Sequence, residues 1–570
     1  MCYPLLIDHL FANGPLTTRH PAPGCAEEPD SSLRDVVHEA IMLRSILTVG
    51  GWTLVSRILG FARDMLIAAL VGTGPIADAF FVALKLPNLF RRLFGEGAFN
   101  AAFVPAFSGL LQTEGPASAK RFAEEAFAVM TFWLGMMTIA AEIFMPRLMI
   151  VLAPGFAADP AKFDLAVSLS RITFPYVILI CLAALVSGIL NGLERFTAAS
   201  ASYVLFNIIS IACMIWMTPY VPTVGHALAW GVTLSGVAQL GILLFAVRRR
   251  GMALSVPRPR LTPQMRLLMR RMVPGLLGAG VTQLNLAVDV IIASLLPPGT
   301  VSVLYFADRV QQLPLGVIGT AVGTALLPLL SRQVRAGEAA AAVSTLNRAI
   351  EYALFLTLPA ALALILCAYP IILVLFGRGE FATQSVLMSS QSLAAYALGL
   401  PAFVLVKVLA PGFFARDDTS GPVKVGTGCV LLNLSLNVAF MIPLAHVGPA
   451  LATSLAAICN AAGLALILFR RGHFRPDRTL RRRTLGMVAA SAIMGVVLLT
   501  MRHVLFATPT HGLVRVMALT GLIASGMVAY VGSAQVFGAY DFRDVTRMMH
   551  RRRLRRANES AISSARTTET

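Results

Sequence analysis

Long apolar segments recur along this chain, and each is long enough to cross a lipid bilayer as one helix. Of the 570 residues, 57% are hydrophobic and 13% are charged, and the mean hydropathy is +0.74. Soluble globular proteins carry roughly 25% charged residues. An apolar stretch of roughly 20 residues spans the hydrocarbon core as a helix, which satisfies its own backbone hydrogen bonds there. The chain is therefore expected to be an all-α polytopic membrane protein.

These segments predict fourteen membrane helices. Loops after odd-numbered helices carry almost no Lys or Arg, with Lys162 and Arg378 as exceptions. The basic clusters, at 248–271, 470–483 and 543–556, all follow even-numbered helices. Lys and Arg accumulate in cytoplasmic loops, so both termini are predicted to be cytoplasmic. The predicted helices are 47–71, 78–108, 123–153, 165–190, 198–218, 224–248, 270–296, 303–332, 346–376, 388–412, 422–443, 447–470, 483–506 and 512–538.

Composition and motifs argue against several other functions. The net charge of +19 arises from residues that collect in the predicted cytoplasmic loops, so it does not indicate nucleic-acid binding. The seven cysteines show no CxxC or Cys/His ligand spacing, which argues against a disulfide framework and a zinc site. No Ser/His/Asp set, phosphate-binding glycine loop or HExxH motif occurs. The sequence therefore indicates a transporter without a bound cofactor, neither an enzyme nor an ATPase.

Two halves of the chain share landmarks at a constant separation. The segment VGHALA at 224–229 matches VGPALA at 447–452, 223 residues later, and Pro105 and Pro328 have the same separation. Chance agreement between apolar, Gly-rich helices is the alternative. The repeat predicts two pseudo-symmetric six-helix lobes followed by two further helices. Transporters built this way bind substrate between the lobes and rock to give alternating access.

The expected regions follow from this repeat and from composition. Residues 1–41 are polar and lack the basic and apolar regions of a signal peptide, so we expect a disordered cytoplasmic extension. The other regions are an N-lobe (42–250), a basic cytoplasmic linker (251–271), a C-lobe (272–470), a basic cytoplasmic loop (471–482), two terminal helices (483–538) and a basic cytoplasmic tail (539–570).

Cations interrupt the apolar segment 57–105, where a membrane protein tolerates them least. Charged groups at bilayer depth are rare and face a cavity or a partner. The cations are Arg57, Arg63, Lys85, Arg91 and Arg92. They outnumber the nearby carboxylates, which are Asp64, Asp78 and Glu96, and Asp64 is the expected local counter-ion. We therefore interpret this segment as the wall of an anion-binding cavity.

The second predicted helix places several of these residues on one face. Asp78, Lys85 and Arg92 are seven residues apart and form one stripe, with Asn88 beside it. The alternative for Arg91 and Arg92 is a cytoplasmic helix end from which long side chains reach water. That alternative suits Lys85 poorly, because Lys85 lies nearer the middle of the helix.

One deep cation, Arg309, lies in the eighth predicted helix and would close the cavity from the second lobe. Ser302 and Gln312 flank it as neutral hydrogen-bonding groups. The planar guanidinium suits phosphate because it can bond two oxygens together. The alternative is an ion pair with the adjacent Asp308, or a charge at a helix end.

A second polar group is separate from these cations. Asp289 lies in the seventh predicted helix, Asn433 and Asn437 share one face of the eleventh, and Thr453 lies in the twelfth. Their oxygens suit Na⁺ or a proton relay. The alternative is that the asparagines join helices by hydrogen bonds while Asp289 pairs with an arginine.

At these residues the chain resembles the MurJ (MviN) lipid II flippases of the multidrug/oligosaccharidyl-lipid/polysaccharide exporter superfamily. The resemblance runs from about residue 42 to about residue 537. Its motifs are SRILGFARD (56–64), ADAFFVALKLPNLFRRLFGEGAF (77–99), APGF (153–156), ITFPY (172–176), YFADRVQQLPLG (305–316), FGRGEF (376–381) and KVLAPGFFARDD (407–418).

The resemblance implies a MATE-like fold that exports lipid II, the undecaprenyl-pyrophosphate-linked peptidoglycan precursor, across the bacterial inner membrane. It implies that Arg57, Arg63 and Arg309 are central-cavity arginines. Residues that complete the predicted substrate-binding set are Arg91, Asp78, Asn88, Lys85 and Ser302. It also implies the Na⁺ site of part of the family at Asp289, Asn433, Asn437 and Thr453, whereas Gln312 replaces a residue that is acidic in some members.

Lipid II and membrane lipids are the expected partners, together with proteins of cell-wall synthesis and division, and we expect a monomer that binds no nucleic acid. Three alternatives stay open. A cation-coupled multidrug exporter of the same superfamily requires an acidic cavity, and an exporter of another lipid-linked oligosaccharide requires a cationic one. A non-transporting scaffold for cell-wall enzymes would tolerate changes of the cavity charges.

Overall fold

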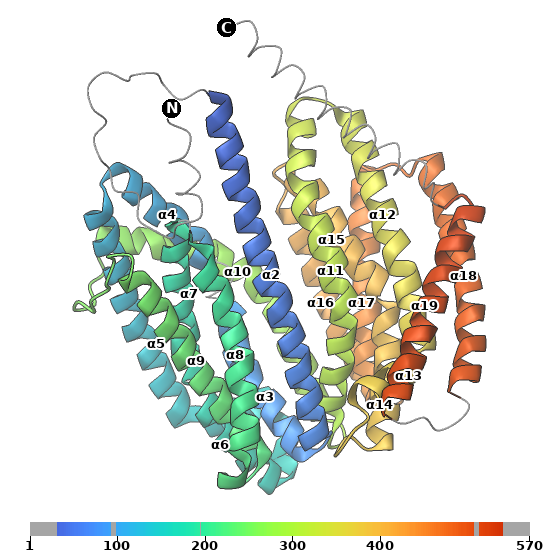
Figure 1. Ribbon diagram of the computed structural model, residues 1–570, viewed down its shortest axis with the longest axis horizontal. Coiled ribbons are helices and arrows are strands. Elements are labelled where there is room, and N and C mark those ends of the chain that lie inside the picture. The colour runs from blue at the N-terminus through green and yellow to red at the C-terminus, as the bar shows by residue number, and fades with distance from the viewer. Residues whose placement is uncertain (1–30, 93–98, 194, 507–511, 540–570) are drawn as a thin grey trace, which may run out of the picture. The chain divides into compact units, whose positions relative to one another are not determined.

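The computed structural model describes residues 31–92, 99–193, 195–506 and 512–539. The chain divides into two compact units, Met1–Gly51 and Trp52–Thr570, and the functional features all lie in the second. The regular structure of the described residues is helical (Figure 1). The all-α fold class predicted from the sequence is therefore confirmed.

The first helix, α2 (Ser31–Val71), begins earlier than predicted. Residues 1–30 of the expected disordered extension lie outside the described residues. Residues 31–41 are helical, so the prediction of disorder is wrong there. No Gly or Pro occurs between Ser31 and Val49 to end the helix, and an existing helix extends at little cost.

The first lobe contains seven more α-helices after α2. They are α3 (Pro75–Phe90), α4 (Phe99–Thr113), α5 (Pro116–Leu152), α6 (Pro160–Thr173), α7 (Tyr176–Gly192), α8 (Phe196–Trp216) and α9 (Val224–Arg248). Two short 3₁₀ helices, η2 (Pro154–Ala158) and η3 (Thr218–Tyr220), lie in the loops. The predicted helix 165–190 is broken between α6 and α7, where Pro175 cannot donate a backbone hydrogen bond.

The second lobe repeats this order. It contains α10 (Pro263–Ser294), α11 (Thr300–Arg335), α12 (Ala339–Leu366), α13 (Ala368–Phe376), α14 (Thr383–Leu398), α15 (Leu400–Phe414), α16 (Ser420–Met441) and α17 (Val447–Arg470). The starts of α5 and α12, α6 and α14, and α9 and α17 are each 223 residues apart. The pair α14 and α15 is broken as α6 and α7 are. The internal repeat predicted from the sequence is therefore a repeat of structure.

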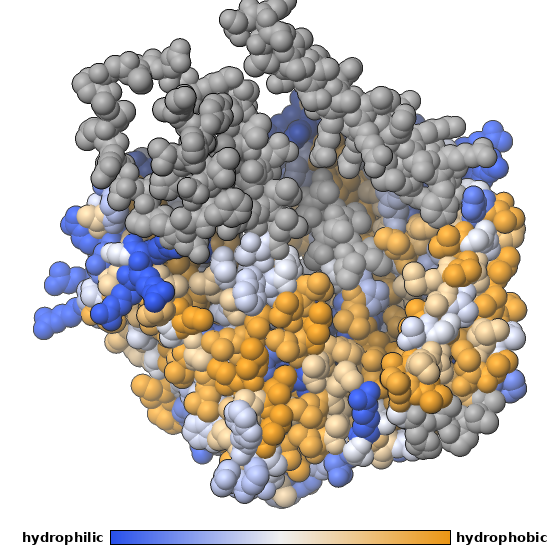
Figure 2. All heavy atoms as spheres, viewed as in Figure 1, coloured by the Kyte–Doolittle hydropathy of each residue, from blue (hydrophilic) through white to orange (hydrophobic). Residues whose placement is uncertain are grey.

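Two final helices, α18 (Arg478–Leu505) and α19 (Gly512–Val536), pack against each other, and α18 also contacts α12. Tyr530 of α19 donates a hydrogen bond to the Phe355 carbonyl at 2.8 Å. Large apolar side chains on the outer helices are exposed, such as Trp133 on α5 and Val528 on α19. Hydrophobic residues cover much of the face shown in Figure 2. This is the surface expected of a protein surrounded by lipid.

Ten described segments are long and apolar enough to cross a membrane by length and composition. The predicted spans outside this set are α2, α3 with α4, α10 and α11. These four carry most of the polar residues predicted to form the site. Side chains that face a polar cavity lower the hydropathy of a spanning helix, and this explains why the least apolar helices are the functional ones.

Candidate functional site

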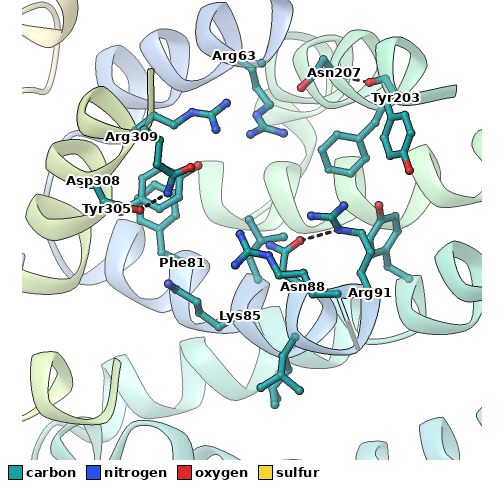
Figure 3. A pocket seen from close by; sticks show the side chains of 18 of the residues that line it. Arg63, Phe81, Lys85, Asn88, Arg91, Tyr203, Asn207, Tyr305, Asp308 and Arg309 are labelled. Carbon is teal, nitrogen blue, oxygen red and sulfur yellow. Dashed lines mark hydrogen bonds between the residues drawn. The ribbon is translucent and has the colours of Figure 1, made fainter. Parts of the chain in front are cut away.

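A cavity of about 350 Å³ lies where the first lobe faces α10 and α11. Among the described residues, six cations and one carboxylate line it. The cations are Arg57, Arg63, Lys85, Arg91, Arg92 and Arg309, and the carboxylate is Asp308. Figure 3 shows Arg63, Lys85, Arg91 and Arg309 around one space, from α2, α3 and α11. The predicted cavity cations are therefore brought together by both lobes.

A buried carboxylate, Asp64, joins two of the arginines. Arg63 Nη2 lies 2.9 Å from Asp64 Oδ1, and Arg309 Nε lies 2.5 Å from Asp64 Oδ2. The Tyr305 hydroxyl donates to Asp64 Oδ1 at 3.3 Å. The expectation that Asp64 is the local counter-ion is confirmed for Arg63, and the same carboxylate also reaches across to the second lobe. Arg309 thus forms its ion pair with Asp64 and not with the adjacent Asp308.

Two glycines make room for arginines of the opposite lobe. A Cβ atom at Gly60 of α2 would lie 3.1 Å from Arg309 Nη2, and one at Gly316 of α11 would lie 2.5 Å from Arg57 Nη1. Each arginine therefore lies against a glycine of the facing helix. Sequence reasoning missed this reciprocal arrangement, although both glycines stand in the motifs SRILGFARD and YFADRVQQLPLG.

The α3 residues contribute a second wall. Arg91 Nε donates to Asn88 Oδ1 at 3.4 Å, which orients the guanidinium beside the cavity (Figure 3). Lys85 interacts electrostatically with Asp308 and Asp289 of the second lobe. Gln312 donates a hydrogen bond to Asp308. Asn88, Lys85 and Arg91 therefore lie where the sequence predicted, in the cavity lining.

Asp78 and Ser302 do not line the cavity. They meet at one end of the bundle, formed by the loops 72–74, 153–159, 295–299 and 377–382, which we call the closed end. Asp78 is 1% exposed and accepts hydrogen bonds from Gly299 N (2.7 Å), Ser302 N (2.9 Å) and Ser302 Oγ (2.8 Å). Lys162 Nζ lies 2.8 Å from Asp78 Oδ2. A carboxylate at the N-terminus of α11 is favoured by the free amides and the helix dipole. Asp78 thus connects the lobes, and substrate binding by Asp78 and Ser302 stays a prediction.

The second polar group is also brought together, on α10, α16 and α17. Asn437 Nδ2 donates to Asp289 Oδ1 at 3.3 Å and to Asn433 Oδ1 at 2.8 Å, and Asn433 Nδ2 donates to Thr453 Oγ1 at 3.3 Å. The Asn437 Oδ1 atom is buried without a hydrogen-bond partner. An acceptor of this kind beside a carboxylate fits a hard cation such as Na⁺. Helix-joining hydrogen bonds, the alternative, are present as well.

Further lining residues come from helices that carried no predicted site. They are Tyr176 of α7, Tyr203 and Asn207 of α8, and Gln239 of α9. Asn207 Nδ2 donates to the Ser56 carbonyl at 3.1 Å and so joins α8 to α2. Asn207 had a sequence signal only as a repeat partner of Asn433. Neutral polar residues of this kind are common in membrane helices, so their spacing alone does not indicate a cavity.

Two helical lobes that share one cationic cavity define a membrane transporter and not an enzyme. A sequence model of the family described as "Lipid II flippase MurJ" matches residues 67–518. The chain is 42% identical over 519 residues to the probable lipid II flippase MurJ of Rhizobium tropici, covering 90% of this chain and 97% of that one. It is 34% identical over 457 residues to the lipid II flippase MurJ of Burkholderia cenocepacia, covering 80% and 89%. The chain therefore belongs to the lipid II flippase MurJ family.

Solved structures agree with this assignment. A lipid II flippase MurJ in an inward closed conformation matches with a TM-score of 0.73 and 26% identity, over 87% of this chain and 99% of that one. An inward-facing MATE-family multidrug resistance transporter matches with a TM-score of 0.63 over 73% and 94%, at 14% identity, which shows the shared fold alone. The MATE-like architecture predicted from the sequence is confirmed.

Proposed function

We propose that this chain moves lipid II from the cytoplasmic to the periplasmic leaflet of the bacterial inner membrane. The supporting observation is that six cations and one carboxylate line one cavity shared by the two lobes. A diphosphate carries several negative charges, and planar guanidinium groups bind its oxygens in pairs. Arg57, Arg63 and Arg309 hold the diphosphate, and no covalent step is required.

Transport proceeds by alternating access. In the predicted orientation the closed end faces the periplasm, and the Asp78 contact holds the lobes together there. The head group enters from the cytoplasmic side while the lipid tail stays in the bilayer beside α18 and α19. The lobes then rock, and the closed end opens.

Resetting the carrier requires a source of free energy. A cation at Asp289, Asn433, Asn437 and Thr453 is one candidate. The membrane potential is the other, since moving one charge through 100 mV supplies about 2.3 kcal/mol. The two sources differ in their dependence on external Na⁺.

Replacement of a cavity cation tests the proposal. In cells depleted of the native protein, Arg309→Ala is expected to abolish growth and to leave lipid II in the inner leaflet. Arg147→Ala is the matched control, because Arg147 is exposed on α5 and does not line the cavity. Both variants are checked for membrane insertion. Normal complementation and normal lipid II topology with Arg309→Ala would contradict the proposed function.

The charge of the cavity separates this function from drug export. A multidrug exporter for cationic compounds requires net negative charge, and the lining residues described here have the opposite balance. An exporter of another lipid-linked oligosaccharide shares the diphosphate, so the lipid II topology assay is the measurement that distinguishes it.

A further inference from the structure

Two sequence motifs have no part in the cavity. They are APGF (153–156), in the loop after α5, and FGRGEF (376–381), which ends α13 and continues into the next loop. Both loops lie at the closed end. Each places a glycine directly against the end of a helix in the opposite lobe.

The first contact joins the APGF loop to α10. A Cβ atom at Gly155 would lie 2.0 Å from the Ser294 carbonyl oxygen and 2.7 Å from Leu295 Cα. The Gly155 amide donates to Ser294 Oγ at 3.3 Å. Because the obstructing atoms are backbone, no side-chain rotation can make room for a larger residue.

The second contact joins the FGRGEF loop to α2. A Cβ atom at Gly379 would lie 2.1 Å from the Ala69 carbonyl oxygen, and the Glu380 amide donates to that same oxygen at 2.9 Å. Gly72 is equally close, since its Cβ would lie 2.3 Å from the Glu380 carbonyl oxygen. Beside these residues, Thr73 Oγ1 and Ser385 Oγ are 2.5 Å apart.

The two contacts are related by the internal repeat. Gly379 follows Gly155 by 224 residues, and Leu295 follows Gly72 by 223. In each lobe, the loop before the fourth predicted helix therefore covers the end of the first predicted helix of the other lobe. The last carbonyls of a helix have no intrahelical partner, so a backbone approached closely at that point can cover them.

We propose that Gly155 and Gly379 are a matched pair of positioning residues that allow the lobes to meet at the closed end. Each contact has one cross-lobe hydrogen bond involving its glycine loop. A hydrogen bond of this kind contributes little net free energy, because water replaces it on opening. Close backbone packing therefore excludes water at the closed end and still separates readily. The inference rests on the proposed function only in making closure a step of transport.

A disulfide between Thr73→Cys and Ser385→Cys, in a background without native cysteines, reports closure. The two side chains already touch across the lobes, so the disulfide is expected to form readily. Gly155→Ala and Gly379→Ala are each expected to lower the rate of disulfide formation by about tenfold, since overpacking against backbone excludes the closed arrangement. Gly155 lies at the contact that does not include Thr73 or Ser385, so its effect tests whether both contacts close together.

Two other glycines provide matched controls. A Cβ atom would meet nothing within 4 Å at Gly74, in the same loop as Thr73, or at Gly135, on α5. Gly74→Ala and Gly135→Ala should leave the rate of disulfide formation unchanged. Unchanged rates with both Gly155→Ala and Gly379→Ala would overturn the proposal. If one of these variants fails to insert, the other still decides the outcome.

The disulfide measurement needs no lipid II, so it is independent of the proposed function. Slower disulfide formation together with lost lipid II translocation supports both ideas. Slower disulfide formation with normal translocation supports the glycine contacts and contradicts closure as a required step of the transport cycle.

Discussion

Replacement of Asp64 by asparagine is the sharpest test of how the cavity charges are arranged. The Asp64 side chain is fully buried, and its two arginine partners are 12% (Arg63) and 30% (Arg309) exposed. Asp64→Asn keeps the shape of the side chain and its capacity to accept the Tyr305 hydrogen bond. It removes the negative charge that both guanidinium groups share.

The structure sets the expected magnitude. Loss of one partner of a buried ion pair destabilises a protein by about 3–5 kcal/mol, because a charge is left uncompensated. The Arg309 contribution must be reduced for solvent screening, since that side chain is partly exposed. We therefore expect Asp64→Asn to lower the free energy of unfolding by about 2–4 kcal/mol. The control is Asp164→Asn on the exposed face of α6, with an expected effect below about 0.5 kcal/mol.

Thermal unfolding of the detergent-solubilised protein, followed by fluorescence of its four tryptophans, measures this difference. A cycle with Arg309→Gln then isolates the pair of residues. The double variant should be less destabilised than the sum of the single variants, by about 1–3 kcal/mol, because no buried carboxylate then lacks its partner. Additive effects, or equal stabilities of Asp64→Asn and Asp164→Asn, would refute the shared carboxylate.

Three further outcomes are expected. Gly60→Ala should displace the Arg309 guanidinium and reduce lipid II translocation severalfold, whereas Gly109→Ala, whose Cβ meets open space, should complement normally. Asp289→Asn should remove any stimulation of flipping by Na⁺, and identical Na⁺ dependence in variant and parent would exclude a cation at this group. The Arg471 side chain, with the backbone and hydroxyl donors of the adjacent loop, lowers the pKa of Asp418 below its usual range. Asp418→Asn should therefore reduce thermal stability at pH 7, with the difference shrinking as the pH falls below about 4, where the unfolded carboxylate begins to protonate.

Hydropathy alone predicted the fourteen helical segments because lipid imposes a simple rule of length and composition. It did not predict the breaks between α6 and α7 or between α14 and α15. The sequence is apolar across both breaks, and Pro175 and Pro401 are compatible with a kinked continuous helix as well as with two helices. The repeat did not help, because both lobes have the break at equivalent positions.

The candidate site was predicted in part for a different reason. Cations in apolar helices are costly enough that each must face a cavity or a partner, so Arg57, Arg63 and Arg309 could be placed there from the sequence. The interlobe pair of Arg309 with Asp64 could not, because residues 245 positions apart carry no spacing signal. Adjacent Asp308 was the simpler sequence-based candidate.

The misplaced residues share one geometric cause. Seven-residue spacing puts Asp78 and Lys85 on one face of a helix, and Ser302 and Arg309 on one face of another, but each step of seven also advances about 10 Å along the axis. A stripe therefore fixes direction and leaves depth open. Asp78 and Ser302 each stand near the start of a helix, and their stripes begin at the closed end and reach the cavity about two turns later. The same spacing that suggested one binding set thus describes two levels of contact between the lobes, a neutralised hydrogen-bonded one at the end and a cationic one in the cavity.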